Sequence, residues 1–236
     1  MARKLLLVLA HPDDESMGNG TLILRHADAG WDVHLVCATR GGMGWNGRPA
    51  GARFEDLPEI RSRELAKAAE VLGLASVELW DYPDGGVPQE DQDEIAGRIR
   101  SAVEQLQPDV VVGWGPDGGY GHPDHIAVGA CTDVALAGSG MPRFHMAIDA
   151  PQAQAWSRAI ESGGGAGFTL QPVLAVDAKF EPTPSELERV KAAVRCHDSQ
   201  LSPMYQAMLD TDERAWWMAR NCYVRAPGSP PAELSP

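Results

Sequence analysis

Short apolar runs alternate with amphipathic segments along the first half of the chain, and this alternation limits the possible folds more than any other feature. Apolar runs of this length are typical of strands buried on both faces of a parallel sheet. Strands that alternate with helices predict an α/β fold with a mostly parallel sheet and helices on both faces. The predicted strands are residues 5–10, 32–39, 77–82 and 109–114, and the predicted helices are residues 17–29, 59–73, 92–106 and about 123–138.

The second half of the chain gives fewer signals. Residues 143–150 and 172–178 are expected to be strands, and residues 185–197 a helix with Ser185 as N-cap and Glu188 completing a capping box. We expect one catalytic domain over residues 1–225. Residues 226–236 are rich in Pro and Ser, which predicts a disordered tail. The Gly-rich segment 40–58 is too long for a simple connection, so we expect a functional loop that brings Met43 and Trp45 to a substrate mouth.

Charge and cysteine content exclude several classes of partner. The formal net charge is −13, which argues against nucleic acid and anionic membranes as partners. The four cysteines form no C-x-x-C pair and lie among apolar neighbours, which is typical of free thiols in a reducing compartment. No apolar stretch is long enough to span a bilayer. We therefore expect a cytoplasmic protein.

Two polar motifs follow two of the predicted strands directly. The first is AHPDDE, residues 10–15, and the second is GHPDH, residues 121–125. In parallel α/β sheets, ligands bind beyond the carboxyl ends of the strands, where both motifs would lie. So many charged groups in one cleft destabilise the fold unless a metal or a substrate compensates them. The two motifs together predict a functional site.

The residue types in these motifs favour metal-assisted hydrolysis. Two histidines and one carboxylate with an open position suit a hydrolytic zinc site, where the metal acidifies water and polarises a carbonyl. A separate carboxylate must then accept the proton of the water. Asp13 and Asp14 can divide these two tasks, and of His122 and His125 one can bind metal while the other faces the carbonyl oxygen. Non-haem iron oxygenases use a similar ligand set, but they have no evident need for the additional carboxylate and histidine.

The combination of motifs resembles the PIG-L/LmbE-like family of zinc-dependent N-acetylglucosaminyl deacetylases. The resemblance covers most of the chain and includes EIRSRELAKAAEVLG, DGGYGHPDH and KAAVRCHDSQ. It implies a Rossmann-like three-layer fold and removal of an acetyl group from an N-acetylglucosamine-type conjugate. The substrate implied is a small molecule, with a precursor of a low-molecular-weight thiol such as bacillithiol or mycothiol as one candidate.

The resemblance also implies roles for individual residues. His11, Asp14 and His125 would bind Zn²⁺, with Fe²⁺ as the alternative metal. Asp13 would be the general base, and His122 would stabilise the oxyanion and help to protonate the leaving amine. Asp124 would orient His122, and Tyr120 would assist at the carbonyl. Glu15 and Arg61 would contact the sugar, with Arg63 as the alternative to Arg61. His197 has no assigned role.

Two other functions stay open at this point. One is an amidase that cleaves thiol S-conjugates with the same site and a different pocket. The other is a sugar- or metal-binding module without catalysis, although binding alone requires neither Asp13 nor His122. The family resemblance also makes a homo-oligomer an expected assembly.

Overall fold

A computed structural model describes residues 2–44, 53–162 and 170–236. Within these ranges, seven strands form one sheet in the order β3-β2-β1-β4-β5-β7-β6. The first five strands are parallel, and β7 runs antiparallel to both β5 and β6. This arrangement confirms the predicted α/β fold with a mostly parallel sheet.

The elements have the following bounds. The strands are β1 (Lys4–Leu9), β2 (Asp32–Thr39), β3 (Ser76–Tyr82), β4 (Val110–Gly113), β5 (Arg143–Ala147), β6 (Ala178–Phe180) and β7 (Asn221–Arg225). The helices are α1 (Asp14–Asp28), α2 (Leu57–Leu72), α3 (Gln92–Leu106), α4 (Gly118–Gly121), α5 (Pro123–Leu136), α6 (Ala150–Ser162), α7 (Pro184–Cys196), α8 (Pro203–Leu209) and α9 (Asp212–Ala219).

The central strand β1 packs against a helical layer on each face. Alternate side chains of a strand point to opposite faces of the sheet. Leu5, Leu7 and Leu9 belong to one core cluster, which includes side chains of α1 and α7. Leu6 and Val8 belong to a second cluster with side chains of α3 and α5. The continuous apolar run of β1 is thus explained by burial on both faces.

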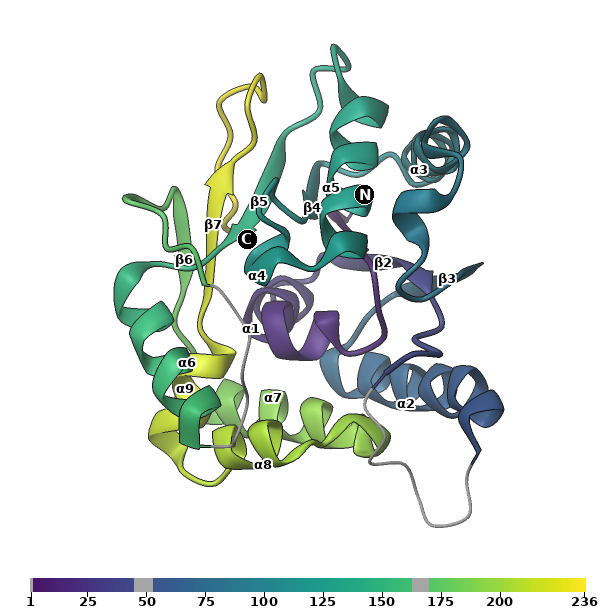
Figure 1. Cartoon of the computed structure of the whole chain (residues 1–236). Helices are drawn as coiled ribbons and strands as arrows, with labels where there is room; N and C mark the ends of the chain where they lie inside the picture. Colours follow the sequence, from purple (N-terminus) through teal and green to yellow (C-terminus); the bar gives the residue numbers. More distant parts are fainter. Residues whose placement is uncertain (1, 45–52, 163–169) are drawn as a thin grey trace.

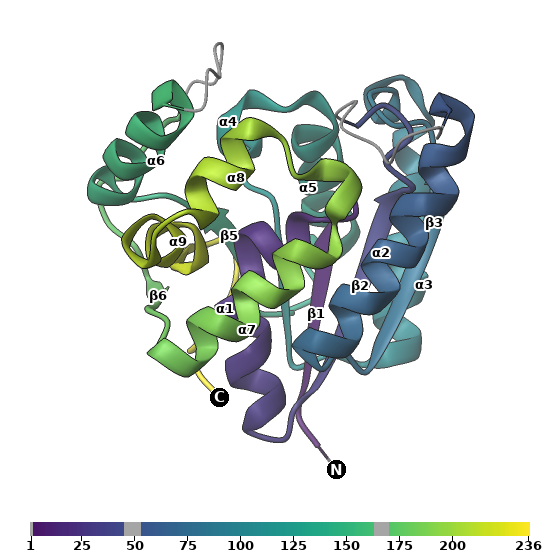
Figure 2. The same ribbon diagram turned by 90° about the horizontal axis from the view of Figure 1, so that it is seen from below.

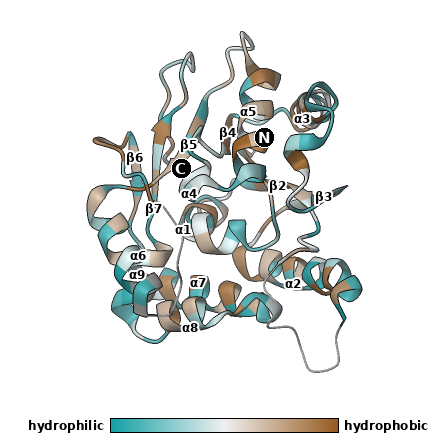
Figure 3. Ribbon diagram, in the orientation of Figure 1, coloured by the Kyte–Doolittle hydropathy of each residue, from teal (hydrophilic) through white to brown (hydrophobic). Residues whose placement is uncertain are grey.

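The two helical layers are visible in Figures 1 and 2. In Figure 2, α1, α2 and α7 cover the near face of the sheet, and α3 and α5 lie behind it. Figure 1 shows α6, α8 and α9 grouped beside this core, near the antiparallel strands β6 and β7. Hydrophobic and hydrophilic residues alternate around the peripheral helices in Figure 3, as expected for helices that bury one side.

The second half of the chain differs from the sequence-based expectation. Helix α6, the short helices α8 and α9 and strand β7 were not predicted, and the expected strand 172–178 reduces to a single bridge at Val173 followed by β6. The N-cap of α7 is Thr183, paired with Glu186 in a capping box, and not Ser185. Pro184 explains this shift, because proline is favoured at the first helical position directly after the cap.

The last residues pack against the body of the protein. The expected disordered tail, residues 226–236, contains Leu234, which is 2% exposed and lies in the first core cluster. The backbone N–H of Ala226 donates to the Arg143 carbonyl. The Pro- and Ser-rich composition concealed this apolar contact. No helix in the described ranges is both long and apolar enough to cross a bilayer.

Candidate metal and active site

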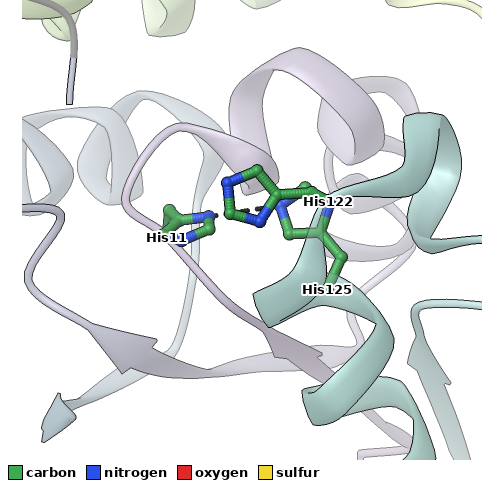
Figure 4. Close-up of side chains that lie close together, drawn as sticks. All are labelled: His11, His122 and His125. Atoms are coloured by element: carbon green, nitrogen blue, oxygen red, sulfur yellow. Dashed lines mark hydrogen bonds between the residues drawn. The ribbon is translucent and has the colours of Figure 1, made fainter. Parts of the chain in front are cut away.

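The pairing of β1 with β4 brings the two polar motifs together. The strands are parallel neighbours, with Leu7 opposite Val112, so the segments that leave their carboxyl ends meet at one edge of the sheet. His11 follows β1, whereas His122 and His125 lie at the start of α5. Figure 4 shows the three rings converging. The ring of His11 lies 4.7 Å from that of His122 and 5.1 Å from that of His125, centroid to centroid.

Hydrogen bonds fix which nitrogen of each ring faces the centre of this cluster. His125 donates its Nδ1–H to the carbonyl of Gly118 at 3.1 Å, which leaves Nε2 as the inward atom. His11 Nε2 lies 3.0 Å from Asp124 Oδ2 and 3.1 Å from Asp84 Oδ1, which leaves Nδ1 as its inward atom. The two inward atoms are 3.1 Å apart. Histidines that bind metals are commonly oriented in this way, by a hydrogen bond from the outward ring nitrogen to a carbonyl or a carboxylate.

The carboxylate of Asp14 completes a set of three donors. Its Oδ1 lies 3.5 Å from His125 Nε2, and its Oδ2 lies 3.9 Å from His11 Nδ1. Tetrahedral bonds of about 2.1 Å to zinc place neighbouring ligand atoms about 3.4 Å apart, so the three donors fit such an ion. Two overlapping groups have ligand atoms within 4.8 Å of one another: His11, His122 and His125, and His11, Asp84 and Asp124. The described residues therefore contain a cluster that could hold a metal ion.

The electrostatics of the cluster favour a bound cation. Burial lowers the pKa of His11, but hydrogen bonds to Asp124 and Asp84 outweigh burial and raise this pKa to about 10. Burial raises the pKa of Asp14 to about 7, although His11 opposes the rise. His125 is held neutral, because burial and then the charge of His11 bring its pKa well below the usual value. The carboxylates around His11 thus stabilise positive charge at this point, and a divalent cation bound at Nδ1 would replace the second ring proton of His11.

Asp13 occupies an unusual backbone conformation beside the cluster. Its φ is 113°, a value that side-chain-bearing residues rarely adopt. Its backbone N–H donates to Glu15 Oε2 at 2.9 Å, and its carboxylate accepts from Arg61 Nη2 at 3.1 Å. Burial raises the pKa of Asp13, and the charge of Arg61 partly opposes this rise. A raised pKa brings a carboxylate closer to the range in which it exchanges protons near neutral pH.

The structure separates Arg61 from Arg63. Arg61 is 3% exposed, lines the cavity described below, and donates to the carbonyls of Pro12 and Gly41 as well as to Asp13. Arg63 points away on α2 and pairs with Glu59 in solvent. Gly41 is required here, because a Cβ at that position would lie 2.3 Å from the guanidinium carbon of Arg61.

His122 and Tyr120 lie at the entrance to α5. His122 is the N-cap of α5, and its Nδ1 accepts the backbone N–H of Asp124 at 3.2 Å. Burial lowers the pKa of His122, with the charge of His11 adding to the effect. The ring of Tyr120 lies 5.8 Å from His122 and 5.3 Å from His125, and burial raises the pKa of its phenol. Both residues line the cavity.

Asp124 has different partners from those expected. Its carboxylate accepts from His11, from the backbone N–H of Gly85 at 2.7 Å and from that of Val87 at 3.2 Å. Its orienting hydrogen bond therefore goes to His11. The charge of its carboxylate acts on His122 only by partly opposing the lowering of the pKa of that ring. The reason is geometric: Asp124 lies in the first turn of α5, where its side chain faces β1 and the loop after β3.

Glu15 also lies elsewhere than expected for a sugar contact. Its side chain is fully buried and does not line the cavity. It contacts His197 Nε2 at 2.6 Å, accepts from Ser16 Oγ at 2.5 Å and accepts from the backbone of Asp13. The role of His197, left open by the sequence, is thus a buried ion pair with Glu15. Burial raises the pKa of Glu15, but the charge of His197 outweighs burial and lowers this pKa. Burial lowers the pKa of His197, but the charge of Glu15 outweighs burial and raises it.

Asp84 is a site residue that sequence reasoning missed. It follows β3, and besides contacting His11 it accepts the backbone N–H of Met43 at 2.7 Å. The carboxyl end of β3 lies at the same edge of the sheet as those of β1 and β4, so the rule that selected the two motifs also selects Asp84. Met43 lines the cavity and is 72% exposed, whereas Trp45 lies outside the described residues.

The site opens into a cavity of about 590 Å³. Ligand pockets for small molecules commonly have volumes of about 300–1,000 Å³. Its lining combines the polar cluster with many apolar side chains of the second half of the chain. The polar residues of the site in this lining are His11, Asp13, Asp14, Arg61, Asp84, Tyr120 and His122.

The sequence matches the PIG-L family, described as GlcNAc-PI de-N-acetylase, over residues 6–136. A protein from Kineococcus radiotolerans named 1D-myo-inositol 2-acetamido-2-deoxy-alpha-D-glucopyranoside deacetylase is 38% identical over 58% of this chain and 46% of its own length. This chain therefore spans about half the length of that curated relative. A protein of the same name from Mycolicibacterium vanbaalenii is 30% identical over 96% of this chain and 92% of its own length.

Solved structures show the same fold. N,N'-diacetylchitobiose deacetylase from Pyrococcus horikoshii superposes with a TM-score of 0.66 at 23% identity, covering 96% of this chain and 85% of that one. At this identity the likeness concerns the fold, and function must be argued from the site itself.

Proposed function

The chain belongs to the PIG-L family of de-N-acetylases, and from this membership and the site geometry we propose that it is a metal-dependent hydrolase. The reaction proposed is removal of the acetyl group from an N-acetylglucosamine-type conjugate. The single observation that carries the proposal is the convergence of His11, Asp14 and His125 on one point, with Asp13 beside them.

We assign the metal to the inward atoms of the three donors: His11 Nδ1, His125 Nε2 and the carboxylate of Asp14. Asp124 is a weaker ligand candidate, because both of its carboxylate oxygens accept a backbone N–H group. The two backbone N–H groups that Asp14 accepts both go to Oδ2, so its Oδ1 faces His125 Nε2. A bound Zn²⁺, or alternatively Fe²⁺, supplies polarisation of the acetyl carbonyl and acidification of water. Asp124 holds His11 in the orientation that points Nδ1 at the site.

Asp13 is the proposed general base. Its carboxylate lines the cavity, and burial raises its pKa toward the range of efficient proton transfer. Arg61 contacts Oδ2 of this carboxylate and so fixes its orientation. In the reaction, the water oxygen bonds to the acetyl carbon as Asp13 accepts the water proton. When the C–N bond breaks, this proton is available to the nitrogen that leaves as the free amine.

His122 is the proposed donor to the oxyanion. Its Nδ1 accepts a backbone N–H, so the neutral ring carries its proton on Nε2. The lowered pKa keeps the ring neutral at neutral pH. An N–H group aimed at the developing negative charge on the carbonyl oxygen stabilises the transition state. Tyr120 lines the cavity with its ring edge-on to His122, and it is proposed to assist.

The names of the two relatives support a small-molecule N-acetylglucosaminyl substrate. A precursor of a low-molecular-weight thiol is one such conjugate. An S-conjugate amidase would use the same residues, and the substrate panel below separates the two reactions. The free thiols of the described cysteines fit a reducing compartment, which supports a cytoplasmic location.

The test is release of acetate or free amine from N-acetylglucosamine, its malate and inositol conjugates and a thiol S-conjugate. Each is measured with chelated protein and after addition of Zn²⁺. We expect zinc-dependent release from at least one N-acetyl sugar. Release from the S-conjugate alone would establish the amidase instead. No release from any substrate, with zinc bound to the protein, would overturn the proposed function.

A further inference from the structure

The cavity continues beyond the polar cluster into a region lined mainly by apolar side chains. We call this region the apolar chamber. Its walls come from β5 and the segment after it, from α6, α8 and α9, and from Leu170. The chamber residues are Met146, Ile148, Trp156, Leu170, Met204 and Met218.

The floor between the cluster and the chamber is closely packed. Met146 Cε would lie 2.6 Å from a Cβ at Gly18, so this thioether rests on the backbone of α1. Asn19 Nδ2 donates to the sulfur of Met146 at 3.3 Å. Methionine is flexible and polarisable, which suits walls that adapt to apolar ligands of varied shape. The chamber is therefore a closely packed apolar surface that continues from the proposed reaction centre.

The arginines of the cavity lining already have anionic partners. Apart from histidines, Arg61 and Arg220 are the cations among the described residues that line the cavity. Arg61 contacts Asp13. Arg220 is 4% exposed and donates to both carboxylate oxygens of Asp149, at 2.9 and 2.6 Å, and to Gln152 at 3.2 Å.

An anionic aglycone would find no unpaired cation among these described residues. The formal net charge of −13 also opposes the approach of anions. Burial of a charged group without a partner destabilises a complex. The chamber thus disfavours a carboxylate or a phosphate and favours a neutral ligand.

We propose that the conjugate carries a neutral, apolar aglycone, an alkyl or aryl group, that occupies the apolar chamber. This inference rests on the proposed function, because it assumes that the sugar lies at the polar cluster. It deepens that function by naming the substrate class. It also predicts weaker acceptance of malate and inositol conjugates, whose aglycones are charged or strongly polar.

The experiment is calorimetric binding of methyl, butyl and hexyl glucosaminides of both anomers to the full chain. These compounds are products of the proposed reaction, so binding does not depend on turnover. A methylene that leaves water completely corresponds to about a fourfold change in Kd. We expect the hexyl compound to bind at least about tenfold more tightly than the methyl compound, with part of the chain buried.

A matched pair of variants on α8 locates the effect. Met204→Glu places a charge in the chamber at a half-buried position. Gln206→Glu adds the same charge on the same helix at an exposed position outside the cavity lining. The dependence of Kd on chain length should disappear in Met204→Glu and persist in Gln206→Glu. Circular dichroism of both variants checks that α8 and the rest of the fold are retained.

The outcomes separate this inference from the proposed function. Equal binding of the three alkyl compounds, or tighter binding of the malate or inositol glucosaminide than of the hexyl one, would overturn the apolar aglycone even if acetate release succeeds. Dependence on chain length without acetate release from any N-acetyl sugar would support the chamber and overturn the deacetylase. Loss of the dependence in both variants would also count against the chamber, because Gln206 does not line it.

Discussion

Asp13 combines a strained backbone with a chemical task. Its left-handed φ is maintained by the contact of its N–H with Glu15, and its side chain is maintained by Arg61. Such conformations cost about 1–3 kcal/mol and persist where the surroundings enforce them. The strain turns the carboxylate of Asp13 toward the cavity while the next residue, Asp14, points at the two histidines.

Substitutions at neighbouring positions should therefore have different effects. Asp13→Asn should retain zinc and lower kcat by about 10²–10⁴-fold, the usual contribution of a general base. His11→Ala should lose tight zinc binding, because one of three donors is removed. Zinc content by mass spectrometry and initial rates measure both effects. Full activity of Asp13→Asn would remove Asp13 from the mechanism, and full zinc content of His11→Ala would remove His11 from the ligands.

At the scale of elements, the buried pair of Glu15 and His197 joins α1 to the end of α7. Both side chains are fully buried, and the pair also reaches the backbone of Asp13. Removing one partner leaves a buried charge without compensation, which costs about 3–5 kcal/mol. The pair thus connects the stability of two helices to the geometry of the base.

His197→Ala should lower the free energy of unfolding by about that amount and also lower kcat. Chemical denaturation and steady-state kinetics measure the two effects. Thr183→Ala is the control, because it removes only the N-cap of the same helix and should cost about 1 kcal/mol with unchanged kcat. A His197→Ala variant with normal kcat would show that the pair stabilises the fold without positioning Asp13.

His26 makes the last turn of α1 sensitive to acid. Its Nδ1–H donates to the Leu22 carbonyl at 2.8 Å, and its ring packs edge-on against Trp31. Burial lowers its pKa below the ordinary value of 6.5, and the Leu22 hydrogen bond only partly opposes this. The unfolded chain therefore binds a proton more readily than the folded one, so stability is present above pH 6.5 and is lost as pH falls through the lower, folded pKa.

We expect His26→Phe to have a flatter profile of unfolding free energy below pH 6.5 than the natural protein. Urea denaturation at a series of pH values measures the difference. Ser101→Ala is the control, because Ser101 is an exposed residue of α3, away from α1, and carries no titratable group. Identical slopes for His26→Phe and the natural protein would show that His26 does not titrate on unfolding.

The bounds of β2 and α3 were predictable to the residue, and β1 and β3 nearly so, because strong periodic patterns control them. The second half was harder to predict. The short helices α8 and α9 have too few turns for a clear period, and β7 pairs antiparallel at a place where the earlier pattern predicts parallel strands. Local sequence does not encode these long-range pairings.

The candidate site also has features that the sequence predicts and features that it does not. The grouping of His11 with His122 and His125 was predictable, because each follows a strand of the same sheet. The partner of the Asp124 carboxylate, the burial of Glu15 and the participation of Asp84 were not, because they depend on side-chain directions in three dimensions. The motifs thus predict which residues lie at the site, whereas tertiary packing determines the hydrogen-bond partners of each side chain.

For the whole molecule, the metal should stabilise the fold. The proposed ligands follow β1 and lie on α5, so an ion that binds them joins segments far apart in sequence. Zinc at about 100 times its Kd should raise the free energy of unfolding by about 2.7 kcal/mol, or Tm by about 5–10 °C. Differential scanning calorimetry of chelated and reloaded protein measures this shift. It should be absent in His11→Ala, and an equal shift in that variant would place the zinc elsewhere.

The chamber and the reaction centre occupy different parts of the sequence. Every residue that we assign to metal or proton transfer precedes residue 126, whereas every chamber residue follows residue 145. Mutations in the later part can thus alter substrate range while the chemistry stays intact. A chain built this way can acquire new substrates by gradual change in one region, without passing through inactive ancestors.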